Sequence, residues 1–359
     1  MKKQYIIPIF VPHLGCPNDC TFCNQRKISG QMKKITESDV IDTIEFYLSN
    51  FKEKNAYKEV AFYGGSFTGI DEETQNKLLE IAYEYVKEKK IDGIRISTRP
   101  DYIDKKTLKR LKKYKVKTIE LGCQSTNDFV LQKCKRGHTY NDIVKASKLI
   151  RWYGFTLGHQ MMVGLPESSA LDDIKTAKDL IKLKPKIVRI YPVLVIRGTE
   201  LENEYNNGEY EPLTVDQAVE RCKELCYLFK KKKINVIRIG LQNTETISSP
   251  GSTGSEVVAG PYHETFRQLV ESSMYYDILL EKMKKISTKA KEIEIIVNPQ
   301  DVNDVVGYKR ENLNKLEELY EVNIVVKQDI KQKENIIDVV MSKKHKDFMD
   351  DDENIKEKV

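Results

Sequence analysis

The sequence has no apolar run long enough to cross a membrane. A membrane-spanning helix needs about 18 or more consecutive apolar residues, and no run in the 359 residues approaches that length. The N-terminal stretch MKKQYIIPIFVPHLGC starts with lysines and ends in Leu-Gly-Cys, as a lipoprotein leader does. However, Pro8 and Pro12 interrupt its short apolar part, unlike the central region of a signal peptide. We therefore expect a cytoplasmic protein with no membrane partner.

The cysteines lack the regular spacing of a disulfide framework. There are seven, an odd number, and only Cys16, Cys20 and Cys23 lie close together. A secreted disulfide-rich protein is therefore not expected. In a reducing compartment, clustered thiols are more often metal ligands or catalytic groups.

The sequence also lacks a strong excess of charge. Its 60 Lys and Arg residues stand against 54 Asp and Glu residues, which gives a net charge of +6. Two lysine-rich stretches, 105–117 and 230–233, would permit contact with nucleic acid. Solvated helix faces are the simpler interpretation, because acidic residues are almost as numerous. Charge alone therefore predicts no partner.

Short β-rich apolar runs alternate with amphipathic helical patterns along the first 242 residues. The helical pattern is clear at 71–89, where apolar residues recur at three- and four-residue spacing. This alternation predicts βαβ units and an α/β fold. Six or seven such units favour a full or partial (β/α) barrel, with a doubly wound open sheet as the alternative. The predicted strands are 4–11, 59–65, 93–99, 117–123, 156–165, 187–195 and 235–242.

The composition changes after residue 242. A loop rich in Gly, Ser, Thr and Pro is followed by a helical pattern near 264–286, so we assign 243–290 to an extension of the core domain, 1–242. Residues 291–359 are predicted to form a small α/β region with a charged, frayed tail.

One motif in this last region is similar to the GxxG loop with which KH domains bind nucleotides. It is Gly-Tyr-Lys-Arg at 307–310, where Arg310 replaces the second glycine. The motif suggests contact with nucleic acid, although the match is incomplete.

Unusual residues follow four of the predicted strands. Cys16 comes after the first strand, GGSFTG after the second and STRPD after the third, and GCQS ends the fourth. Ligands bind at the C-terminal ends of the strands in barrels and doubly wound sheets. We therefore expect these four segments to converge on one site.

Three clustered thiols can serve two kinds of metal site. Structural zinc sites almost always have four ligands, and His13 is the available fourth ligand, because no second CxxC pair follows. Iron–sulfur clusters are held by cysteine thiolates, commonly four. A four-iron cluster held by Cys16, Cys20 and Cys23 would leave one iron able to bind another molecule.

The spacing Cys16-xxx-Cys20-xx-Cys23, with Phe22 before the last cysteine, resembles the signature of the radical S-adenosylmethionine (SAM) superfamily. The resemblance implies that the three thiolates ligate a [4Fe–4S] cluster, with SAM on the unligated iron and Phe22 beside the cofactor. It also implies that an electron donor such as flavodoxin or ferredoxin reduces the cluster. Cleavage of SAM then gives a 5′-deoxyadenosyl radical, which abstracts hydrogen from a substrate.

The resemblance also assigns roles to other strand ends. Gly64 and Gly65 are similar to a Gly-Gly-Glu element that contacts the methionine amino group, with Ser66 in place of the glutamate. Glycine lets the backbone approach a ligand because it has no Cβ, although an ordinary glycine turn after a strand is the alternative. The other expected cofactor-binding residues are Thr98, Arg99 and Gln124.

Longer motifs resemble one branch of the superfamily, the Elongator catalytic-subunit-like proteins, over roughly residues 4–280. They include GCPNDCTFCNQ, FYGGSFTG, STRPDYI, ELGCQS and RIYPVLVI. Neither the acetyltransferase domain of that branch nor its basic tRNA-binding extension is expected here, because no stretch matches them.

Queuine lyases are among the shorter relatives of this branch, so the resemblance extends to them. These enzymes cut the side chain from a free 7-deazaguanine base in queuosine salvage and yield the 7-aminomethyl base. We therefore expect a lyase acting on a small modified base. The alternatives are an Elongator-type enzyme that modifies tRNA and, more remotely, a zinc-binding protein that interacts with RNA.

A deazaguanine needs aromatic stacking and polar partners for its edge. The expected substrate-binding residues are His159, Arg189, Tyr191, Arg238 and His263. Each has a purely structural alternative, and His159 in particular lies in an otherwise apolar run that would suit a core histidine.

Overall fold

The structure is a computed structural model of the 359-residue chain. It divides into two compact units, Met1–Glu264 and Thr265–Val359. No helix in the described part of the chain has the length and apolarity to span a membrane. The described residues are 4–11, 20–24, 35–53, 55–286 and 291–341.

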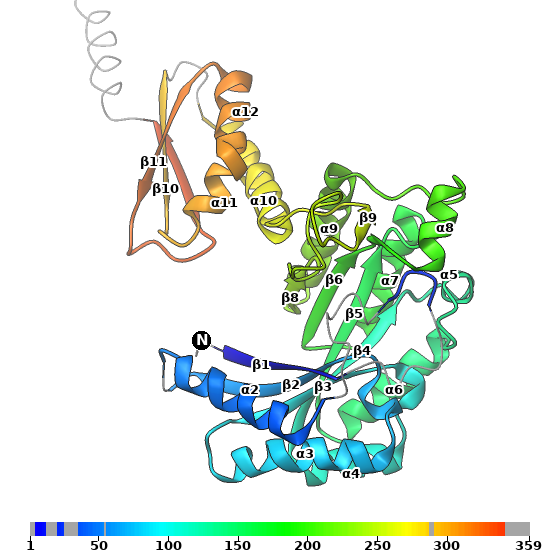
Figure 1. Ribbon diagram of the computed structural model, residues 1–359. Helices are drawn as coiled ribbons and strands as arrows, with labels where there is room; N and C mark the ends of the chain where they lie inside the picture. Colours follow the sequence, from blue (N-terminus) through cyan, green and yellow to red (C-terminus); the bar gives the residue numbers. More distant parts are fainter. Residues whose placement is uncertain (1–3, 12–19, 25–34, 54, 287–290, 342–359) are drawn as a thin grey trace, which may run out of the picture. The chain divides into compact units, whose positions relative to one another are not determined.

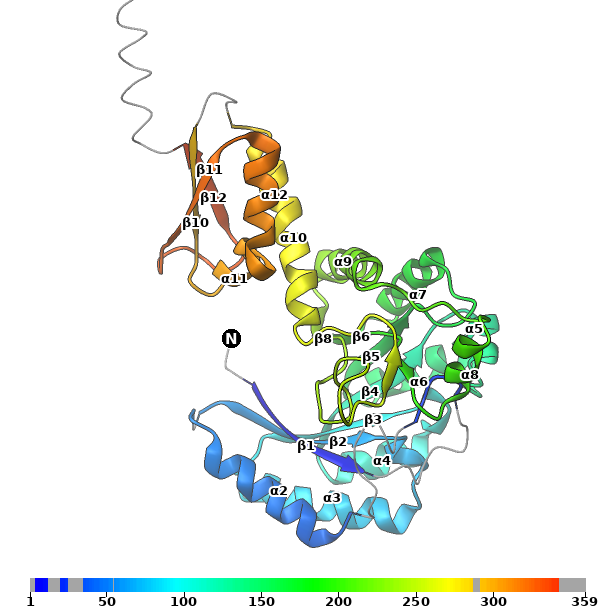
Figure 2. The same cartoon turned by 45° about the horizontal axis from the view of Figure 1, so that its top comes forward.

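The first unit is built on a curled sheet of seven described strands in the order β1-β2-β3-β4-β5-β6-β8 (Figures 1 and 2). All neighbouring strands are parallel, so the connections between them cross over the sheet. This open, curled sheet is a partial barrel, and the predicted fold class is confirmed. The strands are β1 (Gln4–Val11), β2 (Tyr57–Gly64), β3 (Gly93–Thr98), β4 (Val116–Gln124), β5 (Thr156–Val163), β6 (Ile187–Pro192) and β8 (Asn235–Ile239).

Helices connect the strands and cover the outer face of the sheet, where α2, α3 and α4 run along β1 to β4 (Figure 1). A short antiparallel ribbon pairs β7 (Val195–Ile196), which lies between β6 and β8 in sequence, with β9 (Val257–Ala259), which follows β8. The helices are α2 (Glu37–Asn50), α3 (Glu72–Lys87), α4 (Lys105–Lys113), α5 (Asp128–Lys133), α6 (Tyr140–Trp152), α7 (Ala170–Lys182), α8 (Glu200–Asn206) and α9 (Val215–Lys231).

Local sequence explains where several of these helices begin. A capping box pairs a Ser or Thr side chain with the backbone of the third helical residue, whose side chain bonds back to the cap, so two free N–H groups are satisfied. Four helices have this arrangement, at Thr36 and Asp39, Thr139 and Asp142, Ser169 and Asp172, and Thr214 and Gln217.

The second unit has a three-stranded sheet in the order β11-β10-β12, in which β10 is parallel to β11 and antiparallel to β12. Its core joins Tyr275, Leu279 and Met283 of α10 to Ile293 and Ile295 of β10. Because of this packing, α10 belongs with the second unit, whereas the sequence assigned residues 243–290 to an extension of the first. The elements are α10 (Phe266–Met283), β10 (Glu292–Val297), α11 (Val302–Val306), α12 (Glu311–Tyr320), β11 (Asn323–Gln328) and β12 (Ile337–Met341).

The Gly307–Arg310 motif forms the turn between α11 and α12. Gly307 has φ 81°, and a Cβ there would lie 2.8 Å from the backbone nitrogen of Asn312. The buried Asn312 side chain donates to the Ser272 carbonyl at 2.8 Å, and Arg310 pairs with Glu317 at 2.7 Å. Packing therefore accounts for the glycine, and the KH-like contact with nucleotides stays a prediction.

Candidate active site

The described part of the cysteine stretch is a tight turn. The N–H of Cys23 donates to the carbonyl of Cys20 at 2.9 Å, and the N–H of Thr21 donates to the carbonyl of Cys134 at 3.3 Å. These bonds hold Cys20, which is buried, and Cys23, which is partly exposed. Cys16, the third predicted ligand, lies outside the described residues.

A cavity of about 270 Å³ lies beside Cys23 in the first unit. Its wall combines aromatic rings, guanidinium groups and carboxamides from the inner face and C-terminal ends of the strands. The lining includes Phe10, Phe22, Cys23, Tyr63, Gly64, Ser97, Gln124, Arg136, Gln160, Met162, Arg189, Tyr191, Arg238, Gln242 and Thr244.

Gly64 lets β1 and β2 approach each other at the cavity. Its φ is 118°, and a Cβ built there would lie 2.2 Å from the carbonyl oxygen of Val11, its partner on β1. A side chain at this position requires the two strand ends to separate. The glycine is thus needed for the shape of the wall beside Cys23.

We expect Gly64→Ala to weaken SAM binding and to lower stability more than a glycine replacement in open space. Gly208→Ala is the matched control, because Gly208 also has a positive φ of 74° but has nothing within 4 Å of a built Cβ. The control should cost about 1–2 kcal/mol from backbone strain alone. Urea unfolding and equilibrium SAM binding measure both effects. Equal losses for the two variants would show that the close contact with Val11 is unimportant.

Ser66, Thr98 and Arg99 are buried and linked by hydrogen bonds. The Ser66 and Thr98 hydroxyls are 2.7 Å apart, and the Arg99 N–H donates to Ser66 Oγ at 3.2 Å. The Arg99 guanidinium pairs with Asp101 at 2.9 Å. None of the three is among the residues that line the cavity, so their predicted contact with the cofactor stays a prediction.

Gln124 reaches the cavity because β4 ends irregularly. The pairing of β4 with β5 shifts between Gly122 and Gln124, and Gln124 has φ 66°. Such a bulge redirects a side chain at the end of a strand. The carboxamide of Gln160 on β5 donates to Gln124 Oε1 at 3.4 Å. The two carboxamides form one polar edge of the cavity.

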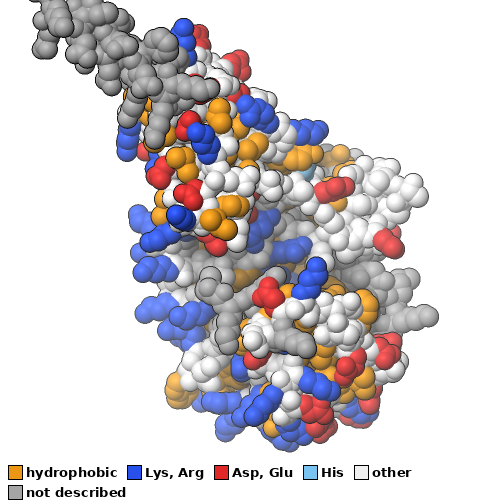
Figure 3. Space-filling model, turned by 90° about the vertical axis from the view of Figure 1, so that its left-hand side faces the viewer, with side chains coloured by type: hydrophobic (Ala, Val, Ile, Leu, Met, Phe, Trp, Pro, Cys, Tyr) orange, Lys and Arg blue, Asp and Glu red, His pale blue; other side chains and the backbone are white. Residues whose placement is uncertain are grey.

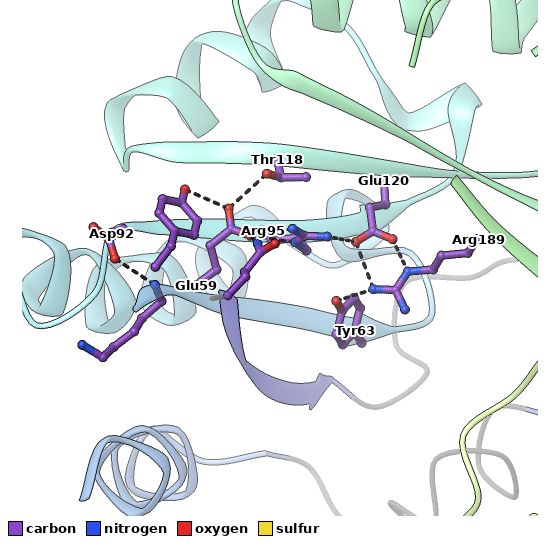
Figure 4. Close-up of polar contacts among 10 residues, drawn as sticks. Glu59, Tyr63, Asp92, Arg95, Thr118, Glu120 and Arg189 are labelled. Carbon is purple, nitrogen blue, oxygen red and sulfur yellow. Dashed lines mark hydrogen bonds and ion pairs between the residues drawn. The ribbon is translucent and has the colours of Figure 1, made fainter. Parts of the chain in front are cut away.

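A network of buried charges crosses the inside of the curled sheet (Figure 4). Arg95 of β3 donates to Glu59 of β2 at 2.6 Å and to Glu120 of β4 at 2.7 Å. Arg189 of β6 donates to the other oxygen of Glu120 and, at 2.6 Å, to the hydroxyl of Tyr63. Two carboxylates and two guanidiniums alternate, so the buried charges are matched.

The network fixes the ionisation of the groups at the cavity. Burial alone would raise the pKa of Glu120, but the guanidiniums of Arg189 and Arg95 outweigh it, so this pKa lies below its usual range. Burial and the Glu120 charge raise the pKa of Tyr63, which is therefore protonated. Because the Tyr63 oxygen accepts from Arg189, its own proton can be donated to a ligand.

Three of the predicted substrate-binding residues line the cavity: Arg189, Tyr191 and Arg238. His159 does not, because alternate β5 residues face opposite sides of the sheet and Gln160 faces the cavity. His159 is 1% exposed, its ring lies 2.9 Å from Ser147 of α6, and burial lowers its pKa to about 3. This placement is that of a neutral core histidine and argues against the predicted substrate contact. His263 is also outside the lining.

Sequence reasoning missed Gln160, Tyr63 and Arg136, which all line the cavity. Strand alternation could have found Gln160, since His159 and Gln160 must face opposite sides. Phe22 and Gln124 were predicted and do line it. Arg136 follows α5 and gave no local signal, because only the three-dimensional fold brings it to the cysteine turn.

These residues fit an iron–sulfur cluster with bound SAM. Thiolates are the usual ligands of such clusters, and the Cys20–Cys23 turn adjoins a cavity with hydrogen-bonding groups. Gly64 lines the same cavity as Cys23 and carries no side chain there. The aromatic and carboxamide groups opposite can hold a nucleoside.

The chain matches two family models in succession. Residues 10–181 match the radical SAM superfamily, and residues 185–276 match its C-terminal domain. An uncharacterized protein of Methanocaldococcus jannaschii is 32% identical over 228 residues, 61% of this chain and 70% of that protein. A tRNA uridine(34) acetyltransferase of the same organism is 39% identical over 128 residues, 35% of this chain.

The aligned part spans only 24% of that acetyltransferase. Among solved structures, archaeal Methanocaldococcus infernus Elp3 with an N-terminal deletion is similar in fold, with a TM-score of 0.61 at 22% identity, over 78% of this chain and 64% of that chain. The family matches and the site together lead to one conclusion: the chain belongs to the radical SAM superfamily, whose cofactors are a [4Fe–4S] cluster and SAM.

Proposed function

We propose that this protein is a radical SAM enzyme that modifies a base of RNA, with tRNA as its substrate. The observation that carries the proposal is the cavity beside Cys23, whose aromatic and amide groups suit a planar, hydrogen-bonding base. The relative named as a tRNA uridine(34) acetyltransferase supports RNA as the source of that base. The expected small free base has no such support, so tRNA modification is the better proposal.

The side chains of the cavity have separable tasks in this proposal. Tyr63 and Tyr191 offer ring faces and hydroxyls, while Gln160 and Arg238 offer groups that can pair with the edge of a base. When bound, the cluster and SAM supply a carbon radical that removes a hydrogen atom from the substrate.

The net charge and the surface charges of the protein are compatible with an RNA partner but do not require one. Lys and Arg side chains and Asp and Glu side chains both occur on the face drawn in Figure 3. The net charge of +6 is modest. An enzyme that neutralises several phosphates should bind RNA with an affinity that falls steeply as salt rises. A flavodoxin or ferredoxin is proposed as the electron donor.

Cleavage of free queuine is the second candidate. The hydrogen-bonded carboxamides of Gln124 and Gln160 favour queuine cleavage, because carboxamides can pair with the donors and acceptors of a deazaguanine. This candidate requires no RNA, so the two proposals predict opposite responses to RNA.

The deciding experiment is an anaerobic incubation of reconstituted enzyme with reductant and SAM, plus unmodified tRNA or queuine. We expect tRNA to stimulate release of 5′-deoxyadenosine and to gain a new nucleoside mass. Gln160→Leu should reduce the stimulated rate about tenfold or more, because a lost hydrogen bond in a closed site costs roughly 1–3 kcal/mol. Gln132→Leu, on the exposed face of α5, should leave it unchanged.

Two results would overturn the RNA proposal. One is conversion of queuine to 7-aminomethyl-7-deazaguanine in the absence of RNA, which would establish the second candidate. The other is release of 5′-deoxyadenosine at the same rate with and without tRNA, with no new nucleoside.

A further inference from the structure

The guanidinium of Arg136 joins the cysteine turn to the end of β4. Arg136 follows α5 in a turn where Lys135 has φ 52°, and only 6% of it is exposed. One terminal nitrogen, Nη1, donates to Cys20 Sγ at 3.3 Å, and the other, Nη2, donates to the Gly122 carbonyl at 2.8 Å. A single planar group therefore bonds to a thiol and to the sheet.

The surroundings fix this arrangement. Gly122 faces the guanidinium closely, since a Cβ built there would lie in van der Waals contact with Nη2 of Arg136 at 3.4 Å. The Thr21 backbone is held from both sides, by the carbonyl of Cys134 at 3.3 Å and by the N–H of Leu201 at 2.8 Å. The end of α5, which Arg136 follows, therefore also holds the cysteine turn through the carbonyl of Cys134.

Arginine has properties at this place that other side chains lack. It stays protonated at every accessible pH, and its rigid fork can bond to two acceptors at once. Lysine would bring the same charge but only a point contact. A buried positive charge bonded to a sulfur also stabilises any negative charge that the sulfur shares.

We propose that Arg136 is a positioning residue that raises the reduction potential of the iron–sulfur cluster through its hydrogen bond to Cys20. Hydrogen bonds to the sulfurs are among the factors that set such potentials. Reduction adds one electron, from the external donor, and no bond to carbon forms or breaks in this step. The reduced cluster is more negative by one charge, so a fixed N–H donor and a cationic group stabilise it more than the oxidised form.

The proposal rests on the superfamily assignment and not on the identity of the substrate. Its test therefore uses the reconstituted full-length protein without any RNA or base. Failure of the RNA proposal would leave this measurement unaffected, and failure here would leave the RNA proposal intact.

The experiment is a redox titration of wild-type, Arg136→Lys and Arg136→Met proteins, followed by electron paramagnetic resonance. For Arg136→Met we expect the equilibrium constant for reduction to fall about tenfold, which is ~59 mV for one electron. Arg136→Lys should lie between, because it keeps the charge and loses the fork. Arg110→Met removes a mostly buried arginine of α4 that pairs with Glu72 of α3, and it should leave the potential unchanged.

The series is informative even if Arg136→Met fails to hold iron, because the lysine variant alone must still titrate at a lower potential than wild type. Equal potentials for wild type and Arg136→Lys, or an increase in either variant, would overturn the proposal. So would a loss of SAM affinity without any change in potential, since that result assigns Arg136 to the SAM carboxylate instead.

Discussion

Replacing Cys20 and Cys23 together with alanine is expected to abolish both iron binding and the release of 5′-deoxyadenosine. The two thiols are held in one turn by the 2.9 Å bond from the Cys23 N–H to the Cys20 carbonyl. Cysteine thiolates are the ligands of iron–sulfur clusters, and a single remaining thiol at Cys16 cannot hold four irons. The rate should fall to the uncatalysed background, because no other group in the cavity can reduce SAM.

The measurement is iron and sulfide content after anaerobic reconstitution, with 5′-deoxyadenosine quantified in the same samples. Cys222→Ala with Cys226→Ala is the matched control. Both thiols are buried side chains of α9, and burial raises the pKa of Cys222 well above its usual value, so it is a poor metal ligand. The control should keep a full complement of iron. A full complement in the Cys20 and Cys23 variant would contradict the assignment.

Hydrophobic periodicity was enough to predict the barrel. The predicted strands 4–11 and 93–99 correspond to Gln4–Val11 and Gly93–Thr98 in the structure. Both faces of a parallel sheet are covered, so its strands appear in the sequence as short apolar runs that turns separate clearly. The run 187–195 was predicted as one strand, whereas β6 ends at Pro192. A proline cannot donate to the sheet, so a strand of this kind ends there.

The interior of the site was harder to predict than its rim. Gly64 and Cys23 carry their signal locally, as a glycine pair and a thiol cluster. Glu120 and Arg95 each stand alone as charges in apolar runs, and their pairing depends on the register of β3 and β4. A sequence shows that such charges need partners inside the barrel, but it does not show which charges meet.

Glycine at position 158 illustrates the same point. A Cβ on Gly158 would lie 2.9 Å from Cγ of Glu120 and 2.9 Å from Cγ1 of Ile187. The glycine leaves room for the carboxylate between β4 and β6, where both arginines reach it. In the sequence it stands in an ordinary β-rich run with no turn nearby. Gly158 leaves space for the ion network only because β4 and β6 lie on either side of it in the folded sheet.

Because of this network, replacement of Glu120 should cost much stability. Glu120→Ala leaves the guanidiniums of Arg95 and Arg189 buried without their shared partner. Breaking a buried ion pair in this way typically costs about 3–5 kcal/mol. Arg189 and Tyr63 also line the cavity, so substrate-dependent turnover should fall even where the protein is still folded.

The loss should depend on pH in a defined direction. The pKa of Glu120 is lower in the folded protein than in the unfolded chain, where a glutamate titrates near ~4.3. Its contribution is therefore fully present above pH ~4.3 and disappears as pH falls through the lower, folded pKa. The difference in unfolding free energy between wild type and Glu120→Gln should be constant from pH 7 to about 5 and should shrink in more acidic buffer.

Urea unfolding of wild type, Glu120→Ala and Glu120→Gln at neutral and acidic pH measures both effects. Glu72→Ala is the control, because the Glu72 carboxylate that pairs with Lys106 and Arg110 is itself half-exposed, and its midpoint should hardly change. Equal midpoints for Glu120→Ala and Glu72→Ala would show that the buried network adds nothing to stability. A difference between wild type and Glu120→Gln that stays the same in strong acid would contradict the lowered pKa. If both expectations hold, the charge pattern inside the barrel both stabilises the sheet and fixes Arg189 at the wall where the substrate binds.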